Sequence, residues 1–580
     1  MAWMWRLHTR EFYPRRDLKK YPVMFLNKSH SYPPFAPLFM WCWIFNEAHG
    51  VYYGCNETFT PGTRGHIMID IDGCALENGL PIPDQKEVEE RKRLNREWIV
   101  NTFAPKWDEL WARHQQELES IYEKEKAFDF QNASVYDLYK IFYETLEVNK
   151  KMWEWHFYFM YGQFGAYWEF EDMCKEYVGI LETDGLWHDL IRGYDNYLFE
   201  MDRAMWDLRN KAIELKVDDV IRKTPPDETI DTLKETEAGK QWLDRHYNDY
   251  MFTKGYGWRQ PRMMEFINPL WWEDPAPLFK WLKQYLLFDG GADMVFPLDE
   301  IRPRLEERRK EAEEEVLRKA RANGYPDMEY FELMMRLVQR TSFYSEAHDW
   351  IDEIQCHAVN RYVFRKIGER LVEFGTFDDP DDIFFFIPDE LGMFIAYPEN
   401  YEVGDLAKER RQEWIKQTEY ENRPPIESAD PNLKPEDTLP YVLGPRDPVV
   451  TKITVGPFVK PRPETGAIVF GNCGNVGTVE GIARRVIHTS DINDVKPGEI
   501  LVAPATHGSW SPVWPLLKGV VTDGGGSVSH ACIVGREYDV PVVSNTGDGT
   551  YKIKTPETES GSNPRRALSL RWNDINPDYA

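Results

Sequence analysis

The chain has 580 residues, of which 42% are hydrophobic and 29% are charged. This length predicts more than one domain, because a single hydrophobic core rarely organises so many residues, and the composition is that of a globular protein. The formal net charge of -27 excludes non-specific nucleic-acid binding, which requires clustered Lys and Arg side chains.

Seven cysteines are spread along the chain, without the close pairs of a zinc site or the density of a disulfide scaffold. A reducing cytoplasm is therefore the expected location. No stretch approaches the roughly 20 consecutive apolar residues that cross a membrane, so no membrane segment is predicted. We assign no residue as a ligand of a resident metal ion.

The first 80 residues are rich in Pro, Gly and aromatic residues and show no clear period, so no regular element is predicted there. From residue 87 to residue 371 apolar residues recur at the three- and four-residue spacing of helices. Ser134 followed by Asp137 predicts a capping box that begins one of these helices. We therefore expect residues 1–422 to form a mainly helical region that binds a substrate.

The residue composition changes at two points in the remaining chain. Ten prolines between residues 423 and 465 predict a linker, because proline removes backbone donors and fixes φ. Residues 466–555 carry short β-type runs between Gly and Pro turns, which predicts a compact α/β domain. Residues 556–580 are polar and predict a C-terminal tail. The expected strands are 467–470, 483–487, 500–502 and 519–522.

The sharpest motif runs from Thr522 to His530 and predicts a strand, a glycine loop and a helix in succession. Glycines let the backbone approach a phosphate group closely, and free amides at a helix start favour an anion. A neutral imidazole in that position can attack a phosphoryl group and carry it as a phosphoramidate. The alternative reading is a glycine turn with Ser529 as an N-cap and His530 as a surface histidine. The residues predicted to bind phosphate are Thr522, Gly524, Gly525, Gly526, Ser527 and Ser529.

Several further segments occur in order around this motif: residues 477–484, 496–502, 536–537 and 540–543, with Thr506 and Trp510 between them. Together they resemble the phosphohistidine swivelling domain of phosphoenolpyruvate-utilising enzymes. The resemblance implies a β/β/α domain in which His530 carries the phosphoryl group and Arg536 belongs to the catalytic group. Val528 stands where dikinases of this family often have Thr, and His507-Gly508 replaces the usual acidic-proline pair.

Residues 268–278 and 377–385 resemble the helical segment that precedes this domain in phosphotransferases related to phosphoenolpyruvate synthase. The acceptor site is expected in this helical part. His348 and Asp352 are four residues apart, so on an α-helix they share a face, where the carboxylate could orient the imidazole as a general base. The alternative is a structural histidine. Trp350 lies between them and is assigned to the same substrate site.

A second candidate is the aromatic stripe of Trp153, His156, Met160, Phe164 and Tyr167, which share a helix face and could stack on an aromatic acceptor. Such a stripe more often belongs to a hydrophobic core. His156 is nonetheless included among the substrate-binding residues, because the 22 tryptophans of the chain make an aromatic acceptor plausible.

Neither a Gly-x-x-x-x-Gly-Lys loop nor an ATP-grasp domain is recognisable in the sequence, so the ATP-binding part is expected on a separate subunit. A histidine carrier joined to a helical acceptor domain resembles the large subunit of phenylphosphate synthase. That resemblance implies ATP with Mg²⁺ or Mn²⁺, AMP and phosphate as products, a phenolic acceptor, and possible association with a small regulatory subunit. The alternatives are a catechol or rifampin-type acceptor, and a phosphocarrier without acceptor chemistry of its own.

Overall fold

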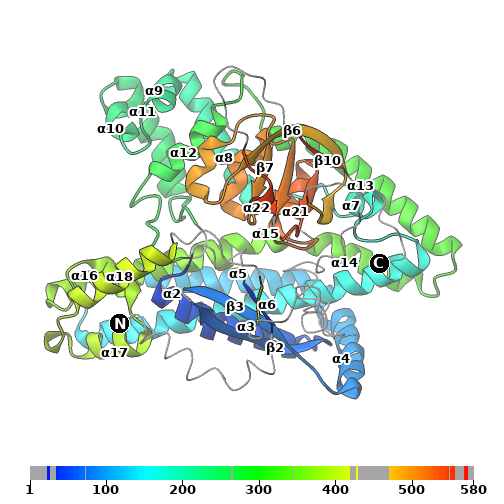
Figure 1. The fold of residues 1–580 in the computed structure, drawn as a ribbon, viewed down its shortest axis with the longest axis horizontal. Helices are drawn as coiled ribbons and strands as arrows, with labels where there is room; N and C mark the ends of the chain where they lie inside the picture. The colour runs from blue at the N-terminus through cyan, green and yellow to red at the C-terminus, as the bar shows by residue number, and fades with distance from the viewer. Residues whose placement is uncertain are drawn as a thin grey trace. The chain divides into compact units, whose positions relative to one another are not determined.

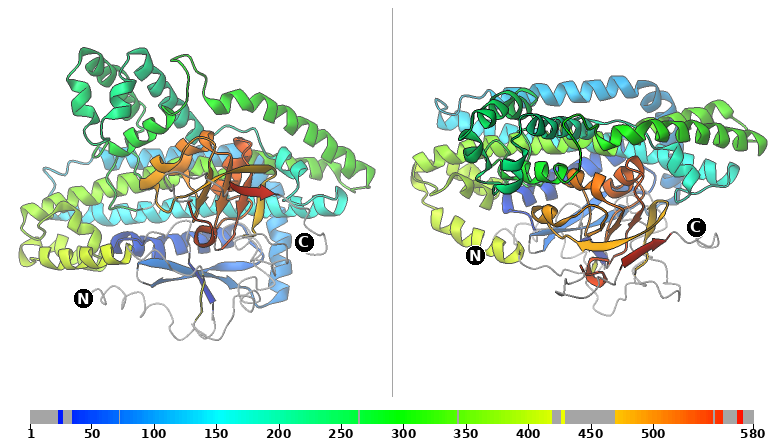
Figure 2. Two further views of the ribbon diagram at one scale, coloured as in Figure 1. Left: turned by 45° about the horizontal axis from the view of Figure 1, so that its top comes forward. Right: turned by 90° about the horizontal axis from the view of Figure 1, so that it is seen from above.

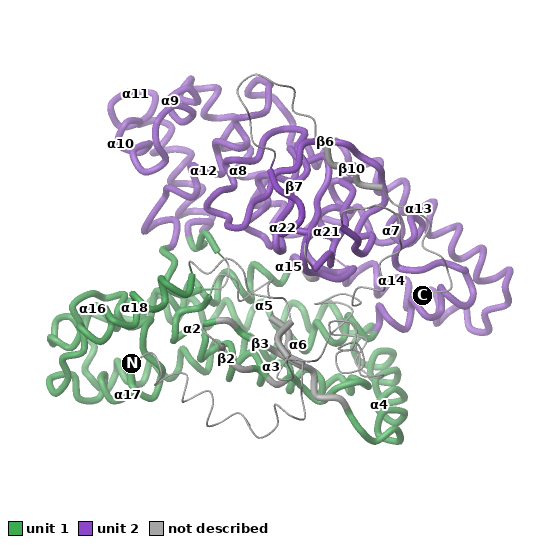
Figure 3. The backbone as a smooth tube through the Cα atoms, viewed as in Figure 1, with its two compact units in different colours: residues 1–165, 258–269, 348–451 green, residues 166–257, 270–347, 452–580 purple. Residues whose placement is uncertain are grey.

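The structure is a computed structural model that describes residues 23–26, 34–71, 73–262, 265–342, 344–418, 426–428, 469–547, 549–555 and 567–571. The chain forms two compact units, each assembled from three segments (Figure 3). Unit 1 comprises residues 1–165, 258–269 and 348–451, and unit 2 comprises residues 166–257, 270–347 and 452–580. These units differ from the sequence-based division at residues 422 and 465, because segments far apart in the sequence pack together.

Unit 1 is mainly helical (Figure 1). Among its described helical elements, η1, η2 and η5 are π-helical turns, in which each backbone N–H binds the carbonyl five residues earlier. Its helices, with α6 continuing into unit 2, are α2 (Pro37–Cys42), η1 (Trp43–Glu47), α3 (Ala48–Glu57), α4 (Gln85–Trp98), η2 (Ile99–Phe103), α5 (Ala104–Lys126), α6 (Val135–Tyr177), η5 (Asp349–Ile354), α16 (Gln355–Glu373), η6 (Pro380–Phe385), α17 (Pro388–Ala396), η7 (Pro398–Asn400) and α18 (Gly404–Thr418).

The long helix α6 is central to unit 1. The predicted capping box is confirmed at its start, where Asp137 N–H donates to Ser134 Oγ and the Asp137 carboxylate accepts from the Ser134 N–H. Helix α3 packs closely against α6 through two glycines. A Cβ at Gly50 would lie 2.6 Å from the carbonyl oxygen of Trp153, and one at Gly54 would lie 2.6 Å from that of Phe157. Only glycine permits this approach of the two backbones.

A small antiparallel sheet also belongs to unit 1, in the order β2-β3-β1-β4. The strands are β1 (Val23–Leu26), β2 (Thr63–Ile71), β3 (Cys74–Pro81) and β4 (Ile426–Ser428). The described part of the first 80 residues, for which no regular element was predicted, therefore contains α2, η1, α3, β1, β2 and most of β3. The predicted linker 423–465 lies outside the described residues except for β4, which pairs with β1.

The helical part of unit 2 includes the C-terminal end of α6. Its remaining helices are α7 (Gly185–Leu190), α8 (Tyr197–Glu214), α9 (Asp218–Lys223), α10 (Thr229–Lys234), α11 (Glu237–Trp242), η3 (Leu243–Tyr247), η4 (Asp249–Thr253), α12 (Ala276–Tyr285), α13 (Pro297–Ala322), α14 (Met328–Thr341) and α15 (Tyr344–His348). Helix α15 ends one residue beyond the boundary of the unit.

The C-terminal part of unit 2 is an α/β domain with a six-stranded sheet in the order β10-β6-β7-β8-β9-β5. Strands β6 to β9 are parallel, and the two edge strands are antiparallel to their neighbours. Figure 2 shows β10 beside β6 at one edge. The elements are β5 (Asn472–Asn475), β6 (Thr478–Arg485), η9 (Thr489–Asp494), β7 (Ile500–Ala503), η10 (Gly508–Leu516), β8 (Gly519–Thr522), α21 (His530–Glu537), β9 (Val542–Ser544), α22 (Gly549–Lys552) and β10 (Ala567–Arg571).

The core of the α/β domain explains why its short apolar runs form strands. Ala483, Ile500, Val502 and Val521 of the three strands β6, β7 and β8 are buried together with Ile553. Parallel strands covered on both faces are rich in such residues. The predicted strands 500–502 and 519–522 are confirmed and 483–487 coincides in part with β6, whereas Val469 and Phe470 are not in a strand.

The predicted fold class is confirmed: a large, mainly helical region is followed by a small α/β domain. The predicted tail 556–580 lies outside the described residues except for β10, which completes the sheet. Among the helices that the structure describes, none is both long and apolar enough to cross a membrane.

Candidate functional site

The glycine loop lies between β8 and α21, so the predicted succession of strand, loop and helix is confirmed. His530 is the first residue of α21, and Ser529 is its N-cap in extended conformation. Gly525 has φ +107, a conformation that L side chains rarely adopt, and a Cβ there would lie 2.7 Å from Ser529 Oγ. The loop therefore requires glycine at this position.

Both ring nitrogens of the His530 imidazole face polar side chains of unit 2, and the hydrogen bond is at Nδ1. Its Nδ1 lies 2.9 Å from Thr506 Oγ1, and its Nε2 lies 3.5 Å from Glu346 Oε2 on α15. The imidazole is 8% exposed and the Glu346 side chain 1%. When Nδ1–H donates to the Thr506 hydroxyl, the lone pair of the ring lies on Nε2, because the partner of one nitrogen fixes the tautomer of the other. The nucleophilic nitrogen then faces a carboxylate.

Several of the loop residues predicted to bind phosphate form hydrogen bonds that stabilise the loop. The Thr522 hydroxyl donates to the carbonyl of Gly524 at 2.8 Å, and the Gly524 N–H donates to the carbonyl of Pro504. The Ser529 N–H donates to the carbonyl of Gly526. These groups give the loop a defined shape around His530.

Arg536, predicted as catalytic, is buried on the far turn of α21. Its Nη1 donates to the carbonyl of Ser527 at 2.8 Å and to that of Gly474 at 3.3 Å. The guanidinium thus ties the loop to β5. In this arrangement Arg536 acts as a positioning residue for the loop that precedes His530.

Two acidic residues, at the end of α21 and just after it, anchor the α/β domain to the α7–α8 loop and to α13 of the same unit. The Glu537 carboxylate accepts the backbone N–H groups of Gly193 and Tyr194 at 2.9 and 3.2 Å. Asp539 is paired with Arg192, Arg304 and Arg308. Burial raises the pKa of Glu537 to about 7, although the Gly193 N–H and nearby arginines oppose the shift.

The predicted pairing of His348 with Asp352 is wrong. Asp352 Oδ1 lies 2.5 Å from His114 Nε2 on α5, and both side chains are fully buried. The physical reason is the π-helical turn η5, which starts directly after His348. A π-helix has more residues per turn than an α-helix, so the residue that follows His348 by five positions, not four, comes onto its face.

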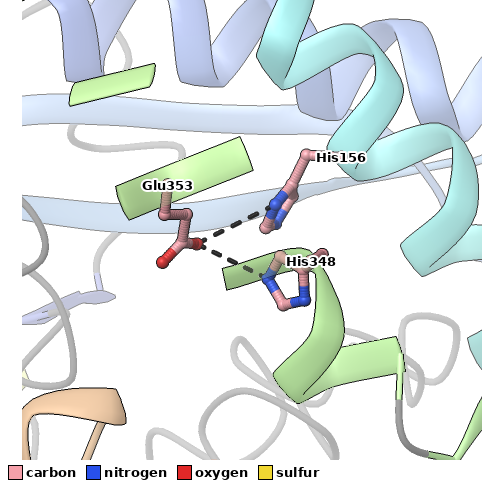
Figure 4. A group of neighbouring side chains, drawn as sticks. All are labelled: His156, His348 and Glu353. Carbon is pink, nitrogen blue, oxygen red and sulfur yellow. Dashed lines mark ion pairs between the residues drawn. The ribbon is translucent and has the colours of Figure 1, made fainter. Parts of the chain in front are cut away.

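His348 instead belongs to a buried cluster in unit 1 with His156 and Glu353 (Figure 4). Glu353 Oε1 lies 3.6 Å from His348 Nε2 and 3.8 Å from His156 Nδ1. The centroids of the two imidazole rings are 4.5 Å apart. Asp349 adds a second carboxylate, with Oδ1 3.3 Å from His348 Nε2. From the sequence, His348 and His156 were two separate candidates for the acceptor site, and in the structure their rings are in contact.

The charges in this cluster bear on the predicted role of His348. Burial by itself would lower the pKa of His348, but the carboxylates of Asp349 and Glu353 raise it to about 9. An imidazole with such a pKa is protonated near neutral pH and has no lone pair with which to accept a proton. This disfavours His348 as the general base of an acceptor reaction.

The aromatic stripe on α6 packs inside the protein. The Trp153 ring lies edge-on to Trp43 at 5.5 Å and to His156 at 4.9 Å. Trp153, His156, Phe164 and Tyr167 are buried, which is the core alternative that the sequence left open. Trp350 is half-buried on η5.

Sequence reasoning did not assign functional roles to Glu346, Thr506 or Glu353. Glu346 and Glu353 lie in or next to the acidic segment around His348, so composition pointed to the region but could not identify the individual carboxylates. Thr506 is 24 residues before His530, and only the fold of β7, β8 and α21 brings the two together.

Residues 154–346 match the fourth domain of rifampicin phosphotransferase, and residues 495–559 match the mobile domain of phosphoenolpyruvate-utilising enzymes. The first range contains His156 and Glu346 and ends two residues before His348. The second contains Thr506, the glycine loop and His530.

Related proteins resemble this chain over much of its length. Chondramide synthase of Chondromyces crocatus is 27% identical over 82% of this chain and 12% of its own length. An uncharacterised phosphotransferase of Bacillus subtilis is 23% identical over 63% of this chain and 41% of its own length. Rifampicin phosphotransferase of the same organism is 24% identical over 62% of this chain and 38% of its own length.

The chain thus spans less than half of each of these relatives. The two matched domains nevertheless include the residues around which the site is built, from Glu346 on α15 to His530 on α21. The chain therefore contains a rifampicin phosphotransferase-like helical domain and a phosphoenolpyruvate-utilising mobile domain.

Proposed function

We propose that this chain is a phosphotransferase that carries a phosphoryl group on Nε2 of His530 and transfers it to a phenolic hydroxyl group. The observation that carries the proposal is the setting of His530, with Nδ1 on the Thr506 hydroxyl and Nε2 facing the Glu346 carboxylate. In the tautomer in which Nδ1–H donates to the Thr506 hydroxyl, Nε2 carries the lone pair that attacks phosphorus.

In the first half-reaction the phosphoryl group comes from ATP, which is bound with Mg²⁺ or Mn²⁺ on an ATP-grasp type subunit outside this chain. The lone pair of Nε2 attacks the β-phosphorus of ATP, and AMP leaves. The γ-phosphoryl group is then released to water as phosphate, and the β-phosphoryl group stays on the imidazole. A metal ion bound with ATP would offset the charge of the phosphates during this step.

In the second half-reaction the acceptor oxygen attacks the phosphorus, the N–P bond breaks and an O–P bond forms. The imidazole leaves as a neutral ring, because Nδ1 keeps the proton that it shares with Thr506. The hydroxyl proton of the acceptor goes to the carboxylate of Glu346. A phenol has a pKa near 10, as Tyr does, so attack near neutral pH benefits from a proton acceptor at this place.

The phenolic acceptor is supported by the resemblance to phenylphosphate synthase and by the aromatic composition of the helical region. A second acceptor class, a hydroxyl group of a rifampicin-type compound, is supported by the match of residues 154–346 to the rifampicin phosphotransferase domain. A carrier that only passes phosphate to another protein would not need a carboxylate opposite Nε2. We place the protein in the cytoplasm, where ATP is available.

The test is isotope exchange, which needs only this chain. A ping-pong enzyme exchanges labelled phenol into phenylphosphate through its phosphohistidine, without ATP or its subunit. We expect exchange with the wild type and with the exposed-surface control Glu329→Gln, and none with His530→Ala. Rifampicin and its phosphate form the second arm. Absence of exchange in both arms, from a folded chain, would reject the acceptor chemistry.

A further inference from the structure

The cluster of His156, His348 and Glu353 is separate in its chemistry from the phosphohistidine site. We propose that these three side chains bind a divalent transition-metal ion such as Zn²⁺ or Fe²⁺. No step of the proposed phosphoryl transfer requires this ion, so the site can be tested independently of that reaction.

The first argument is geometric. The three ligand atoms lie within 4.8 Å of one another, and Glu353 Oε1 is 3.6 and 3.8 Å from the two imidazole nitrogens. A tetrahedral ion with bonds of about 2.1 Å holds its ligand atoms about 3.4 Å apart. Contractions of only a few tenths of an ångström would bring Glu353 and each histidine to that separation. Figure 4 shows the three side chains converging from α6, α15 and η5.

The second argument is burial. His156, His348 and Glu353 are 3%, 4% and 3% exposed. Carboxylates are rarely buried unless they are paired or coordinate a metal ion. Here the carboxylate faces two imidazoles, and Asp349 places another carboxylate beside one of them. A metal ion at this position would give the buried Glu353 carboxylate and both imidazoles a common partner.

The third argument is the type of ligand. Two imidazoles and one carboxylate suit Zn²⁺, Fe²⁺ and neighbouring transition metals, whereas Mg²⁺ prefers six oxygen ligands. The ion is therefore of a different class from the Mg²⁺ that accompanies ATP. Three protein ligands also leave a coordination position for water or another oxygen donor, as in catalytic rather than structural zinc sites.

The fourth argument is the rigidity of the supporting elements. His348 and Glu353 are brought to one face by the π-helical turn, and such turns occur frequently at functional sites. His156 is fixed on α6, where the glycines of α3 allow close packing. A metal site requires this kind of preset geometry, since its ligands must be held within a few tenths of an ångström.

The test uses the full-length chain, stripped with a chelator and then titrated with Co²⁺ as a spectroscopic probe. We expect about one ion per chain, visible d–d absorption bands of a low-coordinate site, and displacement of Co²⁺ by Zn²⁺ but not by Mg²⁺. Zn²⁺ should also raise the thermal unfolding midpoint, because it binds the folded state.

Glu353→Gln and His156→Gln should each weaken Co²⁺ binding at least about tenfold. Glu373→Gln, which alters an exposed carboxylate of α16 outside the cluster, is the control and should leave binding unchanged. Circular dichroism checks that each variant is folded. If the wild type retains no Co²⁺, or if Glu353→Gln binds it as the wild type does, the proposal is overturned, whatever the outcome of the phenol exchange.

Discussion

Asp352 and Glu353 are consecutive residues whose carboxylates contact different histidines. Asp352 Oδ1 lies 2.5 Å from His114 Nε2, whereas Glu353 Oε1 lies 3.6 Å from His348 Nε2. Adjacent residues on a helical turn point in different directions around its axis, so two neighbouring carboxylates can contact two separate histidines. The first joins η5 to α5, and the second belongs to the cluster with His156.

This division predicts a structural role for Asp352. Replacement of Asp352 by Ala removes one partner of a fully buried pair, and we expect the free energy of unfolding to fall by about 3 to 5 kcal/mol. Denaturant unfolding measures the loss. Phenol exchange per folded molecule should be retained below the unfolding transition. A variant of normal stability that had lost exchange would instead assign Asp352 to the acceptor site.

Glu346 is the predicted proton acceptor for the hydroxyl group. Glu346→Gln keeps the size of the side chain but removes its basicity, so the exchange of phenol into phenylphosphate should slow by about 100-fold or more. Glu329→Gln, on the exposed face of α14, is the control and should exchange at the wild-type rate. An undiminished rate in Glu346→Gln would show that the proton leaves by another path.

Glu537 predicts a pH dependence of stability. Its pKa of about 7 in the folded chain lies above the ordinary value of 4.5, so the folded state holds the proton more strongly than the unfolded state. As the pH rises, the unfolded state ionises first. The contribution of this group to stability is therefore complete below pH 4.5 and is lost between about pH 4.5 and 7.

The measurement compares the thermal unfolding midpoints of the wild type and Glu537→Gln from about pH 5 to about pH 8. The Gln side chain can still accept the N–H groups of Gly193 and Tyr194 but does not titrate. We expect the wild type to lose more stability than the variant over this range. Other buried carboxyl groups titrate in both proteins and cancel in the difference. Parallel curves would contradict the raised pKa.

The parts that could be predicted from the sequence depend on local chemistry. The glycines before His530 and the Ser134 capping box act over a few residues, so their spacing identifies the loop and the helix start. Apolar runs such as 500–502 and 519–522 likewise identify buried strands. The order of His530, its loop and the surrounding segments was therefore sufficient to predict the α/β domain.

The parts that could not be predicted depend on distant contacts. Strand β1 pairs with β4 across some 400 residues, and neither is recognisable alone. The partners of His348 depend on a π-helical turn, which has no periodicity of its own in the sequence. The contact between Glu346 and His530 likewise joins residues that are far apart in the chain. Sequence spacing identified the acidic segment, but the packing of the folded chain determines which of its carboxylates lie beside histidines.

Two glycines of α3, Gly50 and Gly54, affect the position of the His156 imidazole, about 100 residues later in the chain. The Cα hydrogens of Gly50 and Gly54 occupy space where a methyl group would press on the backbone of Trp153 and Phe157. The rings of these two residues lie 4.9 and 4.7 Å from that of His156. A larger residue at Gly50 or Gly54 would displace the part of α6 that carries His156. These two glycines therefore help to fix the distance from His156 to His348 and Glu353, although neither glycine has a functional side chain.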